Sequence, residues 1–226
     1  MLTAIAPHIW YATHAFAVLG LPTTTRMTVV RLPRGHLWLH SPIPIAPKLK
    51  VALDALGEVR YIVAPSLMHH LFAGHCAAMF PQAQLFGAPG LRAKRPDLSQ
   101  LEDLPAPDTG PWCPELDHLL FEGIPLANET DWFHAPSGTL ILTDLCQWMQ
   151  GDLPLATVLY AKLTGVRSRL AVARTVRLLV RDKLAARASA AQLLRWPIQR
   201  VVVAHNAVIE VDAHAQLARA LQVFGP

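Results

Sequence analysis

The sequence predicts an α/β protein whose buried strands end on residues that can bind a metal ion. Three short apolar runs lead to such residues: residues 61–64 precede His69 and His70, residues 140–143 precede Asp144, and residues 201–204 precede His205. A run of about four apolar residues is typical of a strand that is buried on both faces. Because ligand sites in α/β proteins form at the carboxyl ends of strands, these polar side chains are candidates for one shared site.

Further elements are predicted before and between these runs. Apolar patterning predicts two helices and four strands: helices at residues 46–56 and 70–80, and strands at residues 84–86, 119–121, 130–134 and 139–143. Residues 92–114 are rich in proline and charge, which predicts an irregular connecting loop of the kind that often borders a pocket.

Each candidate ligand also has a purely structural explanation. A histidine after a strand often only hydrogen-bonds within a loop, and Asp144 could cap the N-terminus of a helix. The repeated pattern of a strand followed by a histidine or an aspartate favours a site instead. Imidazole and carboxylate groups together suit zinc, iron or manganese.

The order of these elements resembles that of the metallo-β-lactamase-fold superfamily. Residues 5–10 look like the first strand of that fold, and residues 25–30 and 36–40 look like the next two, with Ser41 where many members have an aspartate. The resemblance covers nearly the whole chain. It implies an αββα sandwich, in which two mixed β-sheets pack together and helices cover their outer faces.

Three stretches narrow the resemblance to one branch of the superfamily. Residues 64–73, 86–91 and 133–140 are similar to a branch that is known as a domain of unknown function. The resemblance therefore implies the fold without naming a reaction.

The main motif of the superfamily, His-x-His-x-Asp-His, is degenerate here. Pro65 and Leu67 occupy the positions of its first two histidines, and a third histidine of the same metal site would lie near Pro125. The first metal site of the family is therefore expected to be lost. The second site keeps a potential donor at each of its four positions: His69, His70, Asp144 and His205. The resemblance implies one ion per chain at this site, either zinc or iron or manganese.

Glu129 and His134 lie where ligands of the lost site would approach, so either could act as a base or an orienting group. Glu129 could instead be a solvated loop acid, and His134 could point into a hairpin.

The expected function is a metal-dependent hydrolase of unknown substrate, in which the ion polarises a carbonyl or phosphoryl oxygen. The alternative is a non-catalytic ligand-binding or interaction protein that keeps the same fold. The sequence contains neither a Gly-x-Ser-x-Gly elbow nor a phosphate-binding Gly-x-x-x-x-Gly-Lys loop, so it lacks the signatures of those enzyme classes.

Composition fits one apolar α/β domain spanning residues 1–226. The chain is 52% hydrophobic and 16% charged, and it has no run of about 18 apolar residues that would predict a transmembrane segment. Residues 1–21 make a poor secretory signal, and three widely spaced cysteines argue against a disulfide framework. We therefore expect a cytoplasmic protein with a small-molecule substrate and no nucleic-acid partner, and a homo-oligomer is left open.

Residues 155–195 are predicted to be a basic helical segment. On a helix, one face would carry four arginines (Arg167, Arg174, Arg177 and Arg181) and the opposite face four apolar residues (Val172, Val176, Leu179 and Val180). A solvated arginine face over a core-facing stripe is the favoured interpretation. An anionic membrane surface, a partner helix or an acidic group on the substrate are the alternatives.

Overall fold

Two mixed β-sheets pack face to face in this computed structural model, which describes residues 1–18 and 20–225. The strands of the first sheet lie in chain order: β1 (Thr3–Ala6), β2 (Ile9–Val18), β3 (Leu21–Arg31), β4 (His36–His40), β5 (Glu58–Ala64), β6 (Gln84–Gly87) and β7 (Leu101–Asp103). The second sheet has the order β12 (Val208–Ile209), β11 (Arg200–Val202), β10 (Thr139–Ile141), β9 (Thr130–His134) and β8 (Leu116–Leu120).

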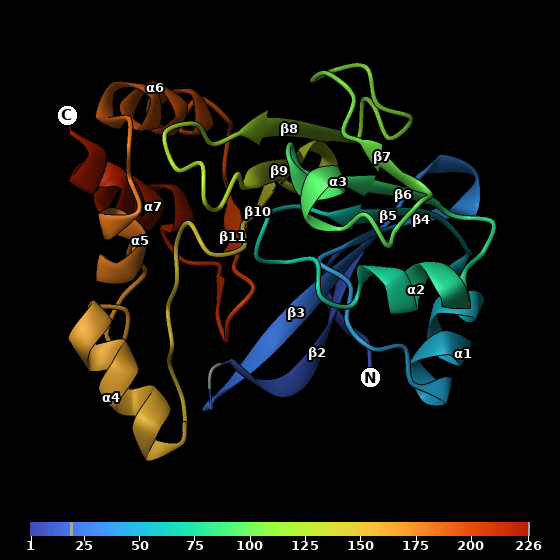
Figure 1. Ribbon diagram of the computed structural model, residues 1–226, viewed down its shortest axis with the longest axis horizontal. Helices are drawn as coiled ribbons and strands as arrows, with labels where there is room; N and C mark the ends of the chain where they lie inside the picture. The colour runs from blue at the N-terminus through green and yellow to red at the C-terminus, as the bar shows by residue number, and fades with distance from the viewer. Residues whose placement is uncertain (19, 226) are drawn as a thin grey trace.

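Helices cover the outer faces of both sheets (Figure 1). The first sheet is covered by α1 (Pro47–Leu56), α2 (Ala73–Met79) and α3 (Leu91–Lys94). The other side of the molecule carries α4 (Leu155–Thr164), α5 (Arg174–Leu178), α6 (Lys183–Leu193) and α7 (Ala213–Leu221). The described residues also form three short 3-10 helices: η1 (Pro33–Gly35), η2 (Ala135–Ser137) and η3 (Gln222–Phe224). The predicted αββα sandwich is confirmed.

Apolar side chains fill the space on both sides of each central strand. In β10, Leu140 packs into the core beneath α6 and α7, whereas its neighbour Ile141 packs between the two sheets. This alternation is what a strand buried on both faces requires. Between the sheets, Trp132 lies 4.7 Å from Trp38 and 5.1 Å from Trp112, measured between ring centroids, so aromatic packing joins the sheets.

Several boundaries differ from the sequence prediction for local reasons. Residues 5–10 span the turn of a hairpin, because His8 adopts a positive φ of 64° between β1 and β2. The helix predicted from residue 70 begins at Ala73, since the chain first makes a turn in which the Ser66 hydroxyl accepts the backbone N–H of Met68 and His69. The proline-rich segment contains a strand, β7, and the C-terminal elements β12 and α7 were not predicted.

The basic segment is three helices rather than one continuous helix. Gly165 ends α4 in the left-handed conformation, and an isolated bridge between Gln147 and Ala171 then holds an extended connection. Only Val176 of the predicted core-facing stripe lies in a helix, but the four residues do face the core: Val172 is buried, and Val176, Leu179 and Val180 pack against the same cluster.

All three cysteines are free, as the sequence indicated. Within residues 1–18 and 20–225, no helix is both long and apolar enough to cross a bilayer.

Candidate metal centre

Three side chains from three strand ends meet at one edge of the sandwich. Nε2 of His69 lies 3.2 Å from Oδ2 of Asp144, and Nε2 of His205 lies 3.1 Å from Oδ1 of the same carboxylate. Their potential ligand atoms all lie within 4.8 Å of one another. Strands β10 and β11 are parallel neighbours, so the residues that follow them emerge at the same edge, where the turn after β5 also arrives.

The position of the proton on His205 is fixed by a backbone carbonyl. Nδ1 of His205 lies 2.6 Å from the carbonyl oxygen of Thr24, and a carbonyl oxygen only accepts hydrogen bonds. Nδ1 therefore donates, and Nε2 of the neutral ring presents a lone pair to the Asp144 carboxylate. Two lone pairs at 3.1 Å repel each other unless a proton or a metal ion binds to them. A carbonyl that holds the second nitrogen of a histidine is the usual outer partner of a metal ligand.

His69 is held by two serines. The Ser41 hydroxyl lies 2.8 Å from Nδ1 of His69, and the Ser66 hydroxyl accepts the backbone N–H of His69 at 3.0 Å. Ser66 is completely buried, so the turn that presents His69 is anchored in the core. With Nδ1 occupied by Ser41, the other ring nitrogen of His69 faces Asp144.

Asp144 is positioned by Glu129. The Glu129 carboxylate accepts three consecutive backbone N–H groups, from Thr143 at 2.6 Å, Asp144 at 2.8 Å and Leu145 at 2.9 Å. Its oxygens are thus engaged with the loop that presents Asp144. The structure places Glu129 behind the three converging side chains, as a support for the loop.

Electrostatics favour a charged Asp144. Burial acts to raise its pKa, but the charge of His69 and the hydrogen bonds from both histidines outweigh burial and hold the pKa well below the ordinary value. Burial likewise acts to lower the pKa of His205, and the hydrogen bond to Asp144 outweighs it and raises the pKa. An anionic carboxylate between two imidazoles is a good environment for a cation.

His70, the fourth predicted ligand, does not join this group. Its Nδ1 lies 3.2 Å from Nη1 of Arg95. A guanidinium only donates, so Nδ1 accepts and Nε2 carries the proton, which leaves neither nitrogen of the neutral ring with a free lone pair. Burial, and then the charges of Lys94 and Arg95, lower the pKa of His70 to about 4.

His134, predicted as a catalytic group, lies at the other end of the second sheet. Strands β9 and β10 are antiparallel, so His134 pairs with Thr139 at the start of β10, whereas Asp144 follows the end of β10. Its Nδ1 is 2.7 Å from the Ser137 hydroxyl within the hairpin. This is the hairpin orientation that the sequence left open as an alternative.

A buried arginine near the site was not identified from the sequence. Arg26 of β3 donates from Nη1 to the carbonyl of Val203 at 2.7 Å and from Nη2 to that of Asn206 at 3.1 Å. Its guanidinium lies 4.4 Å from the centre of the Tyr11 ring, and burial lowers its pKa to about 10. Arg26 therefore holds the loop that presents His205. Nothing in the local pattern of the sequence signals it, because its partners are backbone carbonyls about 180 residues away.

A family model described as a domain of unknown function, DUF4336, matches residues 7–169. No curated protein sequence matches the chain.

Solved structures with the same fold are numerous. A metallo-β-lactamase from Pontibacter korlensis has 14% identity and a TM-score of 0.65, with 98% of each chain covered. The metallo-β-lactamase FIM-1 from Pseudomonas aeruginosa, solved in its mono-zinc form, has 11% identity and a TM-score of 0.66, covering 100% of this chain and 96% of that one. The metal-soaked Flv1 flavodiiron core from Synechocystis has 12% identity and a TM-score of 0.68, covering 99% of this chain and 60% of that one. At these identities the likeness establishes the fold.

Proposed function

The chain belongs to the DUF4336 family and has the metallo-β-lactamase fold, and from this premise we propose that it is a hydrolase dependent on one transition-metal ion held by His69, Asp144 and His205. The observation that carries the proposal is the fixed proton of His205. Because Nδ1 of His205 donates a hydrogen bond to the carbonyl of Thr24, its Nε2 keeps a lone pair. This lone pair and the Asp144 carboxylate are two potential metal ligands that face the same point.

The donor set suits the proposed ion. Two imidazoles and one carboxylate suit zinc, iron and manganese, and a set of three protein ligands would leave a coordination position for substrate, as in catalytic zinc sites. The Asp144 side chain keeps 20% of its surface exposed, so an ion can reach it from solvent. When bound, the ion would supply Lewis-acid polarisation of a carbonyl or phosphoryl oxygen.

The residues of this chain would then orient the ligands and balance their charge. The carbonyl of Thr24 and the hydroxyl of Ser41 fix the two imidazole rings, and Glu129 fixes the loop of Asp144. We assign Glu129 a positioning role and His134 no role at this site. His70 binds Arg95 and is not assigned as a metal ligand.

Metal content of protein purified without a His tag tests the ligand set. Wild-type protein is expected to hold about one zinc, iron or manganese ion per chain, and His69→Ala, Asp144→Asn and His205→Ala each to lower metal affinity at least tenfold, since each removes a ligand. The matched control is His70→Gln, which is expected to keep the ion. Full occupancy in His205→Ala, or loss of the ion in His70→Gln with the fold intact, would contradict this ligand set.

A metal titration tests whether the second site is lost. Pro65 is buried and Leu67 packs against the core of the first sheet, so neither position offers a donor. Saturation is expected at one ion per chain. Two ions about 3.5–4 Å apart, as in two-metal hydrolases, would refute the one-ion proposal.

Turnover separates the hydrolase from a non-catalytic protein with the same fold. The metal-loaded protein is expected to cleave some member of a panel of ester, phosphoester and lactam substrates, and Asp144→Asn to lose that activity while His70→Gln keeps it. Tight binding of one ion with no cleavage anywhere on the panel would favour the non-catalytic alternative.

A further inference from the structure

The outer helix α4 exposes leucines and buries small polar residues. Its leucines at positions 155, 159 and 163 are 87%, 59% and 62% exposed and, being spaced by four residues, share one face. The opposite face is buried and consists of Thr157, Ala161 and Thr164. This is the reverse of an ordinary surface helix, in which the apolar face is turned towards the core.

The exposed apolar surface continues beyond α4. Leu178 at the end of α5 is 78% exposed, and Leu184 in the first turn of α6 is 79% exposed. Helix α5 lies directly against α4, because Nη1 of Arg174 donates to the carbonyl of Leu163 at 3.2 Å. Figure 1 shows α4, α5 and the start of α6 along one side of the molecule, away from α1. We call this surface the leucine-rich end, defined by Leu155, Leu159, Leu163, Leu178 and Leu184.

Basic side chains outnumber acidic ones around these leucines, where Asp182 caps α6 beside Leu184. Residues 153–181 contain six of the 20 Lys and Arg residues of the chain and none of its 16 Asp and Glu residues. The six are Lys162, Arg167, Arg169, Arg174, Arg177 and Arg181. In the part of the chain that the structure describes, none of the six forms an ion pair.

Two adjoining hollows place these cations beside apolar side chains. One, of about 490 Å³, is lined by Arg169, Arg174, Arg177 and Arg219. The other, of about 530 Å³, is lined by Arg174, Arg177 and Lys183 together with Leu178, Val180, Val223 and Phe224. Among the described residues, none that lines either hollow is acidic.

We propose that the leucine-rich end docks on an anionic lipid bilayer, with its leucines in the membrane interface and its arginines on the lipid phosphates. A membrane surface offers hydrocarbon and phosphate at the same place, so it satisfies both kinds of side chain at once. Arginine binds phosphate through its planar fork of donors. The solvated arginine face that the sequence favoured does not account for the exposed leucines.

Other occupants fit less well. In a symmetric dimer the same patch of both copies would meet, which would bring two sets of six positive charges together. A nucleic acid would neutralise the arginines but leave the leucines in water. The charge and the apolar surface together select the bilayer.

Co-sedimentation with vesicles tests the proposal. The wild-type protein is expected to bind vesicles of phosphatidylcholine with about one third phosphatidylglycerol, to bind phosphatidylcholine vesicles far less, and to bind less as salt screens the charges. Arg169→Gln combined with Arg177→Gln should weaken binding about 30-fold, from about 1 kcal/mol for each basic residue. Leu159→Glu should weaken it at least about tenfold, because a charge then enters the apolar interface.

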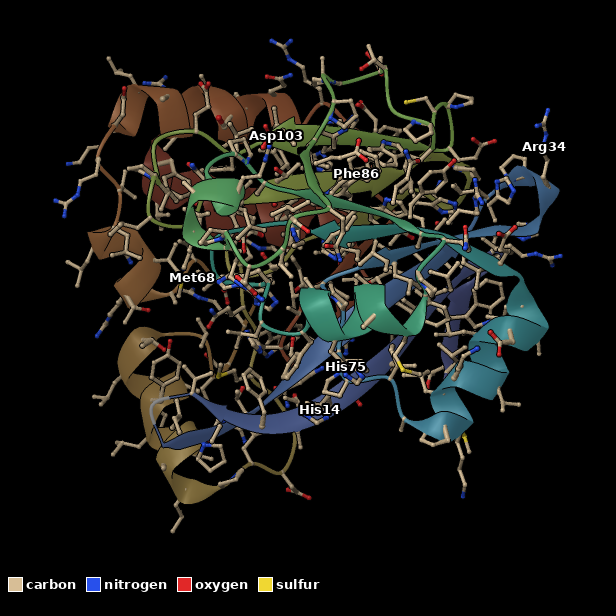
Figure 2. The ribbon with its side chains drawn as sticks, turned by 45° about the vertical axis from the view of Figure 1, so that its right-hand side comes forward. His14, Arg34, Met68, His75, Phe86 and Asp103 are labelled. Carbon is tan, nitrogen blue, oxygen red and sulfur yellow. The ribbon has the colours of Figure 1, made fainter. Side chains whose placement is uncertain are left out.

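Matched controls use exposed residues far from this surface. Val51→Glu on α1 changes an apolar residue that is 69% exposed, and Arg31→Gln combined with Arg34→Gln removes two exposed charges in and beside η1. Arg34 is labelled in Figure 2 at the edge of the molecule opposite α4. All control variants should bind anionic vesicles nearly as wild type does.

Three results would overturn the proposal. The first is equal binding to neutral and anionic vesicles, or none to either. The second is a dimer by gel filtration that Leu159→Glu dissociates, which would identify a second copy as the occupant. The third is binding of inorganic phosphate that competes fully with vesicles and is unchanged in Leu159→Glu, which would identify a soluble anion instead.

Discussion

The carboxylate of Glu129 accepts the backbone N–H of Asp144 at 2.8 Å, so a buried acid holds a partly buried one in place. The same carboxylate accepts the N–H groups of Thr143 and Leu145, on either side of Asp144. The orientation of the Asp144 side chain between His69 and His205 thus depends on a residue that does not contact either imidazole in the described hydrogen bonds.

Glu129→Gln is expected to destabilise the protein by about 3 kcal/mol and to weaken metal binding. An amide has one acceptor oxygen in place of two, so at least one buried N–H group loses its charged partner. Urea unfolding measures the first effect and metal titration the second. Glu102→Gln, at an exposed position, is the control and should change neither quantity. Unchanged stability in Glu129→Gln would show that the loop does not need the carboxylate.

Asp131 is completely buried close to the Glu129 carboxylate. Burial and then the charge of Glu129 raise its pKa well above the ordinary value. The folded state therefore keeps a proton that the unfolded state releases above about pH 3.9, and this difference lowers stability as the pH rises from there towards the raised pKa.

Asp131→Asn removes that loss because an amide does not titrate. The variant should become more stable than wild type as the pH is raised from 4 to 8, with the difference smallest near pH 4. Urea unfolding at several pH values provides the comparison. A difference in stability that is constant over this range would mean that Asp131 has an ordinary pKa.

Without a metal ion, the contribution of the pair of Asp144 and His205 to stability is greatest at mildly acidic pH. The lowered pKa of Asp144 contributes stability that is present above the unfolded value of about 3.9 and lost as the pH falls. The raised pKa of His205 contributes stability that is present below the unfolded value of about 6.5 and lost as the pH rises through the folded value.

A bound metal ion should reverse the loss of stability that His205 causes as the pH rises. A bound ion replaces the proton on His205, so zinc is expected to raise the melting temperature more at pH 8 than at pH 6. Chelated and zinc-loaded protein can be compared by calorimetry at both pH values. His205→Gln should lose the dependence on zinc, and an equal zinc effect in that variant would place the ion elsewhere.

Gly123, in the loop after β8, packs against the start of α6, and its carbonyl accepts the backbone N–H groups of Arg181 and Asp182. Its φ is +86°, and a Cβ atom there would lie 2.2 Å from the carbonyl oxygen of Asp182. This oxygen belongs to the backbone, so a change of side-chain rotamer cannot relieve the clash. Gly123→Ala should therefore cost more than about 3 kcal/mol of unfolding free energy. Gly151→Ala is the control, since its φ of +78° is similar and nothing lies within 4 Å of its Cβ position. It should cost about 1 kcal/mol, and equal losses in the two variants would show that backbone strain alone is responsible.

The sequence predicted the elements whose structure depends on local apolar patterning. Residues 130–134 form β9 as predicted, and the three side chains of the candidate site follow buried strands, as the runs indicated. The resemblance correctly implied the layers of the fold.

The features that could not be predicted from the sequence depend on the direction in which side chains point and on contacts between residues far apart in the chain. His69 and His70 are adjacent, and only the turn set by Ser66 decides which ring faces Asp144 and which faces Arg95. The exposed leucines of α4 were not distinguished from core residues, because that helix packs through small side chains instead. Neither feature is encoded in the spacing of residue types.

The contacts of Arg26 and His205 also limit how early the candidate site can form during translation. Thr24 and Arg26 contact residues 203–207, and these hydrogen bonds join positions 177 to 181 residues apart in the chain. A growing polypeptide that has already produced His69 and Asp144 still lacks the third imidazole and the carbonyls that Arg26 binds. Until residues 203–207 emerge from the ribosome, Arg26 lacks the backbone carbonyls that its guanidinium binds, and the site cannot form before His205 has been synthesised.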